Sequence, residues 1–253
     1  QVEYFADCTY VCDAHRVLLS SGEMISPDRF KAYMGGYEFM LSMGTGRPTK
    51  SAFEAFTENR AHRFPKAMRT TFRPDVPFGH IEDGDVNVFK RHEPKMDVGD
   101  VTLFKVQMKK LFPDEGDHAG MMAYLAALVQ YQGYKFLWSP VVQGTKGNGK
   151  SMLASVVAYC VGPKWSFPVD PQKIDGQFND YIEHKVFLSV DEIHMGDQRT
   201  FLDRLKPLIT DDRIATEGKG KDQKPINNVA NWYFTTNHKS AVIKEADDRR
   251  FAV

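Results

Sequence analysis

The stretch Gly144-Thr-Lys-Gly-Asn-Gly-Lys-Ser151 matches the P-loop signature, in which glycines, a lysine and a hydroxyl residue surround a phosphate. A short apolar run before it, Val141-Val142-Gln143, is typical of the end of a buried strand. The residues from Met152 to Tyr159 favour a helix that closes at Gly162. The sequence therefore predicts the order of strand, loop and helix that a phosphate-binding loop requires.

The residues of this loop have separate expected roles. The glycines let the backbone turn its N–H groups toward a β-phosphate, Lys150 reaches the β and γ oxygens, and the Ser151 hydroxyl holds Mg²⁺. A glycine-rich surface turn is the alternative, and it is a poor competitor because the flanking strand and helix patterns fit a phosphate cradle. We predict ATP and Mg²⁺ as ligands, with the nucleotide bound by Gly144, Thr145, Lys146, Gly147, Asn148, Gly149, Lys150 and Ser151.

Two adjacent carboxylates follow a second apolar strand, Lys185-Val-Phe-Leu-Ser-Val-Asp-Glu192. This is the Walker B arrangement, in which Asp191 lies beside the metal held by Ser151 and Glu192 polarises the attacking water. An Asp-Glu pair alone is usually a solvated strand end. Its position one crossover and one inserted strand after the P-loop makes the catalytic interpretation strong.

A third strand pattern, Asn231-Trp-Tyr-Phe-Thr-Thr236, ends in Asn237, whose amide is expected near the γ-phosphate and the lytic water. An asparagine that favours the following turn is the alternative. The motif Asp247-Asp248-Arg249-Arg250-Phe251 comes next. Arginines beside acidic residues usually form surface ion pairs, but in a nucleotide motor Arg249, or else Arg250, would be an arginine finger for the neighbouring subunit.

Two basic segments are candidates for contact with a nucleic-acid backbone. Glycines alternate with Lys219 and Lys221 in Glu217-Gly-Lys-Gly-Lys-Asp-Gln-Lys224, which predicts a flexible hairpin tip that is either a plain loop or a phosphate contact. Residues 47–73 carry an excess of lysine and arginine, for which a solvated helix face is at least as good an explanation.

Composition describes an ordinary globular protein of 253 residues, with 42% hydrophobic and 26% charged residues. Lys+Arg and Asp+Glu balance at 33 each, so affinity for a polyanion must come from local patches. No apolar run is long enough to span a bilayer and no signal peptide is evident, so we expect a cytoplasmic protein with no membrane partner. Cys8 and Cys12 are expected to be packed thiols, because no second pair of metal ligands follows. The ends of the chain suggest an excerpt of a longer protein.

We expect three parts: an α+β module at residues 1–98, a helical collar at 99–134 and a P-loop core with a parallel sheet at 135–253. In the first part, helices are predicted after Ser26-Pro27 and after Ser51, where Ser51-Ala-Phe-Glu54 forms a capping box and Phe53, Phe56 and Phe64 face inward. The collar has one helix ending at Pro113 and a second capped by Asp117. The apolar stripes of these two helices would either hold subunits together as a collar or pack against the core without any partner. Pro140 argues against a strand across 135–143, so the strand is placed after it.

The order of these motifs resembles the superfamily 3 helicases of viruses, phages and plasmids. It is most similar to the helicase part of phage and poxvirus-type primase-helicases. The resemblance rests on the Walker A loop, Asp191-Glu192, the lysine hairpin, Asn237 and Asp-Arg-Arg-Phe at 248–251, with Gly176-Gln-Phe-Asn179 in support. It implies an AAA+-like ATPase core and a hexameric ring around single-stranded DNA. It also implies 3′-to-5′ movement and an upstream primase or polymerase domain.

The sequence therefore predicts an ATP-dependent DNA helicase that belongs to a phage-type replication protein. Two alternatives remain at this stage. One is a ring ATPase that does not unwind DNA, such as a packaging or remodelling motor, and the other is a nucleotide-dependent scaffold.

Overall fold

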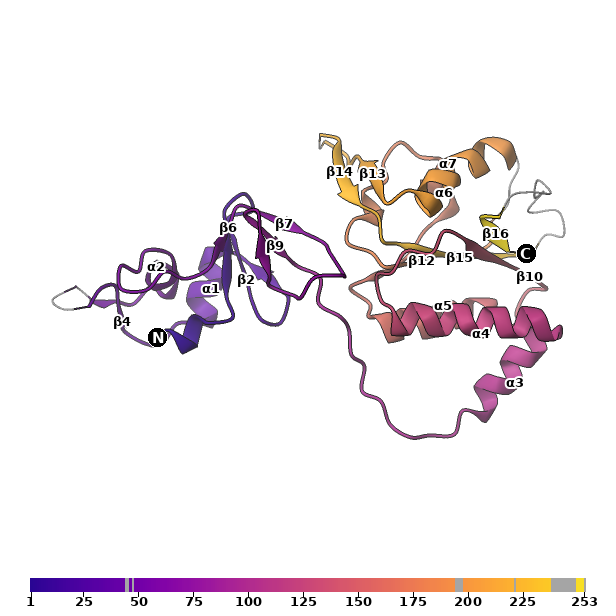
Figure 1. The fold of residues 1–253 in the computed structure, drawn as a ribbon, viewed down its shortest axis with the longest axis horizontal. Coiled ribbons are helices and arrows are strands. Elements are labelled where there is room, and N and C mark those ends of the chain that lie inside the picture. The colour runs from indigo at the N-terminus through magenta and orange to yellow at the C-terminus, as the bar shows by residue number, and fades with distance from the viewer. Residues whose placement is uncertain (44–45, 47, 194–197, 221, 238–248, 253) are drawn as a thin grey trace. The chain divides into compact units, whose positions relative to one another are not determined.

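The computed structural model of the chain describes residues 1–43, 46, 48–193, 198–220, 222–237 and 249–252. The chain divides into two compact units, Gln1–Lys90 and Arg91–Val253, each with its own secondary structure (Figure 1). All the residues predicted to form the catalytic and nucleotide-binding site fall in the second unit. The predicted collar segment, 99–134, also belongs to this unit.

The first unit is an α+β module of short strands and two short helices. Its strands form three sheets, in the orders β3-β2-β1-β6, β4-β5 and β7-β9-β8. In chain order its elements are η1 (Glu3–Phe5), β1 (Thr9–Val11), β2 (Arg16–Leu18), β3 (Met24–Ile25), α1 (Pro27–Tyr33), β4 (Phe39–Met40), β5 (Pro48–Thr49), α2 (Ala52–Thr57), β6 (Lys66–Ala67), β7 (Arg69–Thr71), β8 (Ile81–Glu82) and β9 (Asp85–Asn87).

Both helices of this unit begin where the sequence predicts. Ser26 accepts a hydrogen bond from the Arg29 backbone N–H, and Ser51 accepts one from the Glu54 N–H. The other contact of the predicted capping box, from Ser51 N to the Glu54 side chain, was wrong, because Thr49 bridges the two groups. The Thr49 hydroxyl donates to Glu54 Oε2 at 2.5 Å and accepts from Ser51 N at 3.1 Å. A threonine just before the cap thus replaces the direct contact.

An aromatic core holds the first unit together. Phe5, Phe30, Phe56 and Phe64 are all buried in one cluster. Phe64 packs on Phe56 with ring centroids 5.3 Å apart, although α2 ends at Thr57 and Phe64 lies on the chain beyond it. The prediction that Phe64 belongs to the helix was therefore wrong, while its burial was confirmed. Hydrophobicity fixed its environment and not its secondary structure.

The second unit is built on a five-stranded sheet in the order β11-β12-β15-β10-β16, and every neighbouring pair in it is parallel. A separate two-stranded antiparallel hairpin, β13-β14, projects from it. The elements in chain order are α3 (Thr102–Leu111), α4 (Glu115–Gln130), β10 (Ser139–Gln143), α5 (Lys150–Val161), β11 (Ser166–Pro168), α6 (Pro171–Asp175), η2 (Asp180–Ile182), β12 (Phe187–Val190), α7 (Gln198–Thr210), β13 (Arg213–Thr216), β14 (Lys224–Asn227), β15 (Asn231–Thr236) and β16 (Phe251–Ala252).

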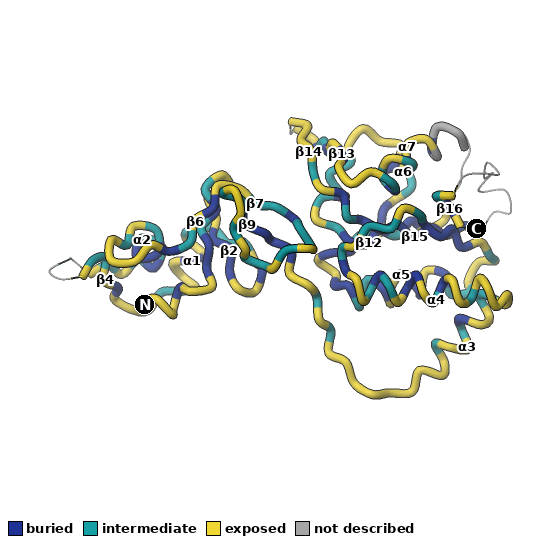
Figure 2. The backbone as a smooth tube through the Cα atoms, viewed as in Figure 1, coloured by how far each residue is buried: buried dark blue, intermediate teal, exposed yellow. Residues whose placement is uncertain are grey.

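Helices cover both faces of this sheet, with α4 and α5 on one side and α6 and α7 on the other (Figure 1). The central strands are the most deeply buried part of the unit (Figure 2). Trp232 and Phe234 belong to the core that includes α7 residues, whereas the Tyr233 hydroxyl donates to the Lys150 backbone on α5. Alternating side chains of β15 thus enter the two helical layers, which is why three large aromatic residues, Trp232 to Phe234, follow one another in its centre.

The prediction that the P-loop strand starts after Pro140 was wrong, because β10 begins at Ser139. Pairing of β10 with the central strand β15 starts only at Val141, so the proline costs no ladder bond on that side. On its other side, Ser139 and Pro140 pair with β16, a strand of two residues that the sequence pattern does not reveal. A proline near the start of a strand is therefore compatible with a central position.

The two helices before the sheet are confirmed, with one correction. Helix α4 is capped by Asp114, whose carboxylate accepts from Gly116 N and Asp117 N, and not by Asp117. Asp117 is instead in the first turn, where a carboxylate also favours the helix dipole. On α3 only Met108 is buried, and Leu103 is 84% exposed. None of the described helices is both long and apolar enough to cross a bilayer.

The partly buried amine of Lys135 lies next to the start of β15. Lys135 Nζ donates to the Leu208 carbonyl at 2.8 Å and to the Ala230 carbonyl at 2.7 Å, and so joins the end of α7 to the start of β15. Burial lowers the pKa of Lys135 from 10.5 to about 7, against the opposing charges of Asp212 and Asp211. The charged form of this lysine is therefore disfavoured in the folded protein.

We expect the stability of the second unit to rise with pH because of Lys135. Between about pH 7 and pH 10 the unfolded chain holds a proton that the folded chain has released, so the free energy of unfolding increases by at most about 1.4 kcal/mol per pH unit. Lys135→Met should flatten this slope. The three tryptophans all lie in this unit, so urea unfolding followed by tryptophan fluorescence reports on it. Equal slopes in the parent and the variant would show that Lys135 stays charged when folded.

Candidate active site

The predicted P-loop joins the carboxyl end of β10 to the amino end of α5. Gly147 and Gly149 adopt the left-handed region with φ of 77° and 98°, a conformation that costs glycine little and other residues more. Gly149 is the residue before the first turn of α5, and no side chain caps that turn among the residues the structure describes. The first N–H groups of α5 are thus left to hold an anion.

Lys150 opens α5 and is buried, with 6% of its surface exposed. Its ammonium donates to the carbonyls of Gly144 and Thr145, both at 2.8 Å, and to Asn148 Oδ1 at 3.0 Å. It also donates to Asn237 Oδ1 at 3.0 Å. Burial lowers the pKa of Lys150, while the carboxylates of Asp191 and Glu192 act to raise it. The amine is thus held over the loop by oxygen acceptors that phosphate oxygens can replace.

The two carboxylates and Asn237 meet at the same edge of the sheet as the P-loop. Strand β12 ends at Val190 just before Asp191, and β15 ends at Thr236 just before Asn237. Because β15 pairs in parallel with both β12 and β10, the carboxyl ends of all three strands lie together. Asn237 Nδ2 donates to Glu192 Oε1 at 3.1 Å. A continuous chain of hydrogen bonds therefore runs from Lys150 through Asn237 to Glu192.

Glu192 has an unusual backbone that Thr235 helps to hold. Its φ is 55°, in the left-handed region, which costs a residue with a side chain about 1 kcal/mol or more. The Thr235 hydroxyl accepts from Glu192 N at 3.3 Å and donates to Asp191 Oδ1 at 3.0 Å. Its carbonyl accepts from Ile193 N at 2.9 Å. One residue of β15 thus holds the backbone of Glu192 and the carboxylate of Asp191, a role that sequence reasoning missed.

Two further residues that sequence reasoning missed support the loop from outside. Gln107 on α3 donates to the Asn148 carbonyl at 2.5 Å. Tyr233 on β15 donates to the Lys150 carbonyl at 3.0 Å, and burial raises the pKa of its hydroxyl. Tyr233 could have been suspected as a polar group in an apolar strand. Nothing in the sequence distinguishes Gln107 from any other exposed helical glutamine.

An apolar cavity of about 370 Å³ adjoins the P-loop strand. It lies between the α3-α4 corner, with Phe112 and Met121, and strand β10, with Val142 and Gln143, and Trp138 closes one side. This volume is within the range of roughly 300–1,000 Å³ typical of small-molecule sites.

The residues predicted to hold Mg²⁺ suit that ion. Ser151 is in the first turn of α5 and Asp191 follows β12, so a hydroxyl and a carboxylate are available at the sheet edge. Mg²⁺ commonly takes one or two protein oxygens and completes its octahedron with water and substrate phosphates. In the described ranges no group of three or more His, Cys, Asp or Glu could hold a metal.

The two candidate finger arginines lie at the opposite end of β10 from the P-loop. The Arg250 carbonyl accepts from Ser139 N at 2.8 Å, which fixes Arg250 at the amino end of the strand. Arg249 is exposed and Arg250 is half-buried. A strand of this length spans about 16 Å, so Arg249 does not complete its own P-loop. Its assignment as the finger stays a prediction.

The lysine hairpin forms as predicted, with Lys219 exposed at its tip, whereas Lys221 lies outside the described residues. The end of its ladder next to the tip, where Thr216 pairs with Lys224, is held by Glu183 from outside the hairpin. Glu183 accepts from Thr216 Oγ1 at 3.0 Å and pairs with Lys224 at 2.9 Å. Partial burial acts to raise the pKa of Glu183, but Lys224 and the Thr216 hydroxyl outweigh it, so the pKa lies below its usual value.

Asn179 provides a second anchor for the hairpin. Its Oδ1 accepts from Glu217 N at 2.8 Å, and its Nδ2 donates to the Ala215 carbonyl at 3.0 Å. The backbone N–H of Asn179 also donates to the Glu217 carbonyl at 3.1 Å. The segment after α6 and the hairpin are thus joined by three hydrogen bonds at one residue.

Three of the seven lysines and arginines in the basic stretch at 47–73 form ion pairs within the first unit. Arg73 pairs with Asp75 and Glu82, Arg69 with Asp85, and Lys50 with Glu38. At these three positions the ion pairs favour the solvated-face interpretation over a phosphate track, because each of the three cations already has a nearby carboxylate. Arg47 lies outside the described residues.

The predicted catalytic and nucleotide-binding residues fall in a region that is similar to known sequences. Residues 142–250 match a family model described as a family of unknown function, DUF5906. The DNA primase-polymerase of Nitratiruptor phage NrS-1 is 26% identical over 193 residues, which are 72% of this chain and 26% of that protein. This chain is therefore a relative of a phage protein much longer than itself.

Solved structures with the same fold come from that phage protein. An apo structure of the NrS-1 C-terminal region gives a TM-score of 0.69 at 20% identity and covers 97% of this chain and 57% of the solved chain. A second apo form gives a TM-score of 0.70 with the same identity and coverage. The chain thus has the fold of the NrS-1 C-terminal region and spans less than two thirds of it.

We expect Asn179→Ala to loosen the hairpin without affecting the P-loop. The change leaves Glu217 N and the Ala215 carbonyl without their partners, at about 0.5–1.5 kcal/mol each. Amide hydrogen exchange measured by mass spectrometry should then accelerate by about 5- to 100-fold across 213–227 and stay unchanged across 139–161. Asn227→Ala, an exposed position on β14, is the matched control. Unchanged exchange in the hairpin would refute the anchoring role of Asn179.

Proposed function

We propose that the second unit is the ATP-hydrolysing helicase part of a phage-type replication protein. The observation that carries this proposal is the chain of hydrogen bonds that joins Lys150, Asn237 and Glu192 at the carboxyl ends of three parallel strands. A lysine for phosphate oxygens, an amide and a carboxylate at one edge are the groups that ATP hydrolysis requires. The similarity to a phage DNA primase-polymerase supports a place in DNA replication.

Each residue at this edge has a role in the proposed reaction. The loop N–H groups and Lys150 bind the β- and γ-phosphates, and the apolar cavity beside β10 takes the base. Ser151 and Asp191 would hold Mg²⁺, which neutralises charge on the phosphates when bound. Glu192 accepts a proton from the attacking water, and Asn237 orients that water while it fixes the carboxylate.

The position of Arg249 supports assembly into a ring. Arg249 is exposed at the amino end of the sheet, away from its own P-loop, and in this proposal it reaches the nucleotide of another subunit, where it stabilises the charge that develops on the γ-phosphate. In this proposal the subunits form a closed ring, with six subunits as the expected number, and α3 and α4 contribute a collar to their interface. The active site is incomplete without the neighbouring copy.

The hairpin supports single-stranded DNA as the partner. Lys219, with Lys221 beside it in the sequence, presents charge on a projecting two-stranded element that is rooted in the ATPase core. Lysines in such a position release counterions when they bind phosphates and read no base sequence. An upstream primase or polymerase domain would use the strand that this unit exposes. A ring ATPase without unwinding activity would share the hydrolytic site but show no strand displacement.

Substitution at Lys150 and at Glu192 should separate binding from hydrolysis. Lys150→Ala removes charge-assisted contacts, so nucleotide affinity should fall by about 10- to 150-fold. Glu192→Gln should keep affinity within a few-fold and lower turnover by about 10²- to 10⁴-fold. Fluorescent-nucleotide titration and phosphate release measure the two effects, with Lys109→Ala on the exposed surface of α3 as the control. A Glu192→Gln variant that hydrolyses ATP near the parent rate would rule out Glu192 as the base.

Mixing of inactive subunits should reveal whether Arg249 acts in trans. Arg249→Ala and Lys150→Ala are each expected to be inactive, but rings that contain both have some interfaces with an intact finger and an intact cradle. ATP turnover should therefore recover on mixing. Lys150→Ala mixed with Glu192→Gln is the control, because both defects lie in the same half of the site and no interface is complete. Absence of recovery in rings shown to have mixed would argue against the trans role.

A further inference from the structure

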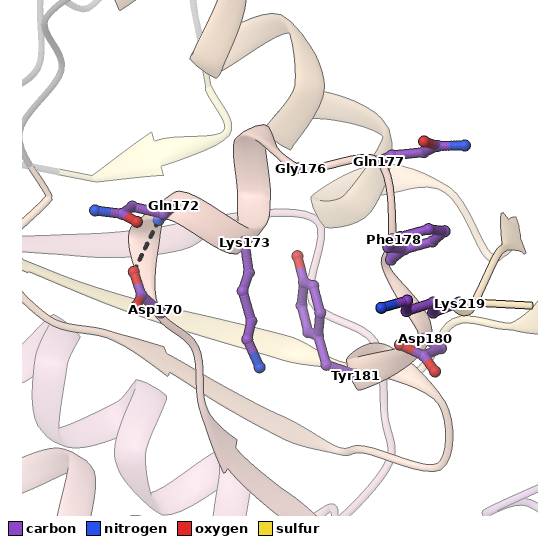
Figure 3. Close-up of a pocket in the computed structure, with 9 residues that line it drawn as sticks. All are labelled: Asp170, Gln172, Lys173, Gly176, Gln177, Phe178, Asp180, Tyr181 and Lys219. Atoms are coloured by element: carbon purple, nitrogen blue, oxygen red, sulfur yellow. Dashed lines mark hydrogen bonds between the residues drawn. The ribbon is translucent and has the colours of Figure 1, made fainter.

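A cavity of about 530 Å³ lies between α6, the segment after it and the tip of the hairpin. Its lining includes Lys173 on α6, Phe178 and Tyr181 on the following segment, and Lys219 on the hairpin (Figure 3). None of these four residues takes part in the proposed hydrolysis. The cavity is therefore a separate feature that the ATPase chemistry does not explain.

Aromatic rings form one wall of this cavity. Tyr181 stacks on Phe167 with ring centroids 6.3 Å apart and an interplanar angle of 22°. Lys173 Nζ lies 5.3 Å from the centre of the Phe167 ring. Phe178 lines the cavity and is 38% exposed, so its ring is available to a ligand. Exposed aromatic surface flanked by lysines is the composition of sites that stack nucleobases and hold their phosphates.

The charges at the cavity favour a ligand with little net charge. Lys173 and Lys219 are accompanied by Asp170 and Asp180. Asp170 accepts from Gln172 N at 2.9 Å and caps α6 (Figure 3). Two cations against two anions suit a base with a single phosphodiester charge and disfavour a free triphosphate, which carries several negative charges.

The cavity is joined to the hairpin by hydrogen bonds on either side of Phe178. Gln177 Nε2 donates to Glu217 Oε1 at 3.0 Å. Asn179 exchanges hydrogen bonds with the backbone of Glu217 in both directions. A ligand in the cavity would therefore move with the hairpin, so a base held there and a phosphate on Lys219 would belong to one unit.

We propose that this cavity binds one nucleotide of single-stranded DNA, with its base stacked against Phe178 and Tyr181 and its phosphate between Lys173 and Lys219. The inference rests on the proposed function and names a base-binding site in addition to the backbone contacts of the hairpin. Stacking is sequence-tolerant because every base has a π-face. The cavity would then hold the strand through its bases while leaving its sequence unread.

A comparison of two strands isolates the base contact. The probes are a fluorescein-labelled thymidine oligonucleotide of about 20 nucleotides and an abasic strand of the same length, and anisotropy measures their affinity for the full chain. Phe178→Ala should lower affinity for the thymidine strand by about 5- to 150-fold and leave the abasic strand nearly unchanged. Phe178→Trp should retain the parent affinity, because its ring also stacks. Tyr159→Ala, an exposed aromatic on α5 away from the cavity, should behave as the parent.

Other results would overturn the inference. Equal losses on both strands, or none, would show that Phe178 does not contact a base. Competition by free thymidine monophosphate or ATP as strong as that of the strand would assign the cavity to a free nucleotide. ATP turnover without DNA, measured beside the titration, separates the two proposals. Turnover without Phe178-dependent DNA binding would refute only the base-binding cavity. Phe178-dependent DNA binding without any turnover would refute only the ATPase function.

Discussion

The side-chain amide of Asn237 is the contact on which the proposed site depends. Its oxygen accepts from Lys150 and its nitrogen donates to Glu192. An amide can satisfy a cation and an anion together only in this orientation, because one end accepts and the other donates. The same residue therefore sets the position of the phosphate-binding lysine relative to the carboxylate that would activate water.

This contact is possible because β15 is inserted between the P-loop strand β10 and the carboxylate strand β12. Parallel pairing on both sides brings the residue after β15 to the same edge as the residues after the other two strands. Thr235, two residues before Asn237, holds the backbone of Glu192 and the carboxylate of Asp191. The buried strand thus determines both the distance and the direction of the groups that meet at the sheet edge.

Much of this edge could be predicted from the sequence. The P-loop, the Asp-Glu pair and the third strand are local patterns, and each residue they predicted at this edge lies where a parallel sheet places it. Other features depend on contacts between distant segments. The two-residue strand β16 forms only because β10 offers it an edge, and Gln107 reaches the P-loop only because α3 packs there. The capping residue of α4 was misjudged because Asp114 and Asp117 both suit the start of a helix, and local sequence does not decide between them.

In the function proposed above, this edge of the sheet hydrolyses ATP in response to a DNA strand. Phosphate release by the unmodified chain, measured with ATP and Mg²⁺ in the absence and presence of single-stranded DNA, tests it most directly. We expect a basal rate that rises when the strand is added, because the hairpin and the proposed active site belong to one compact unit. A chain that binds ATP but releases no phosphate under either condition would contradict it.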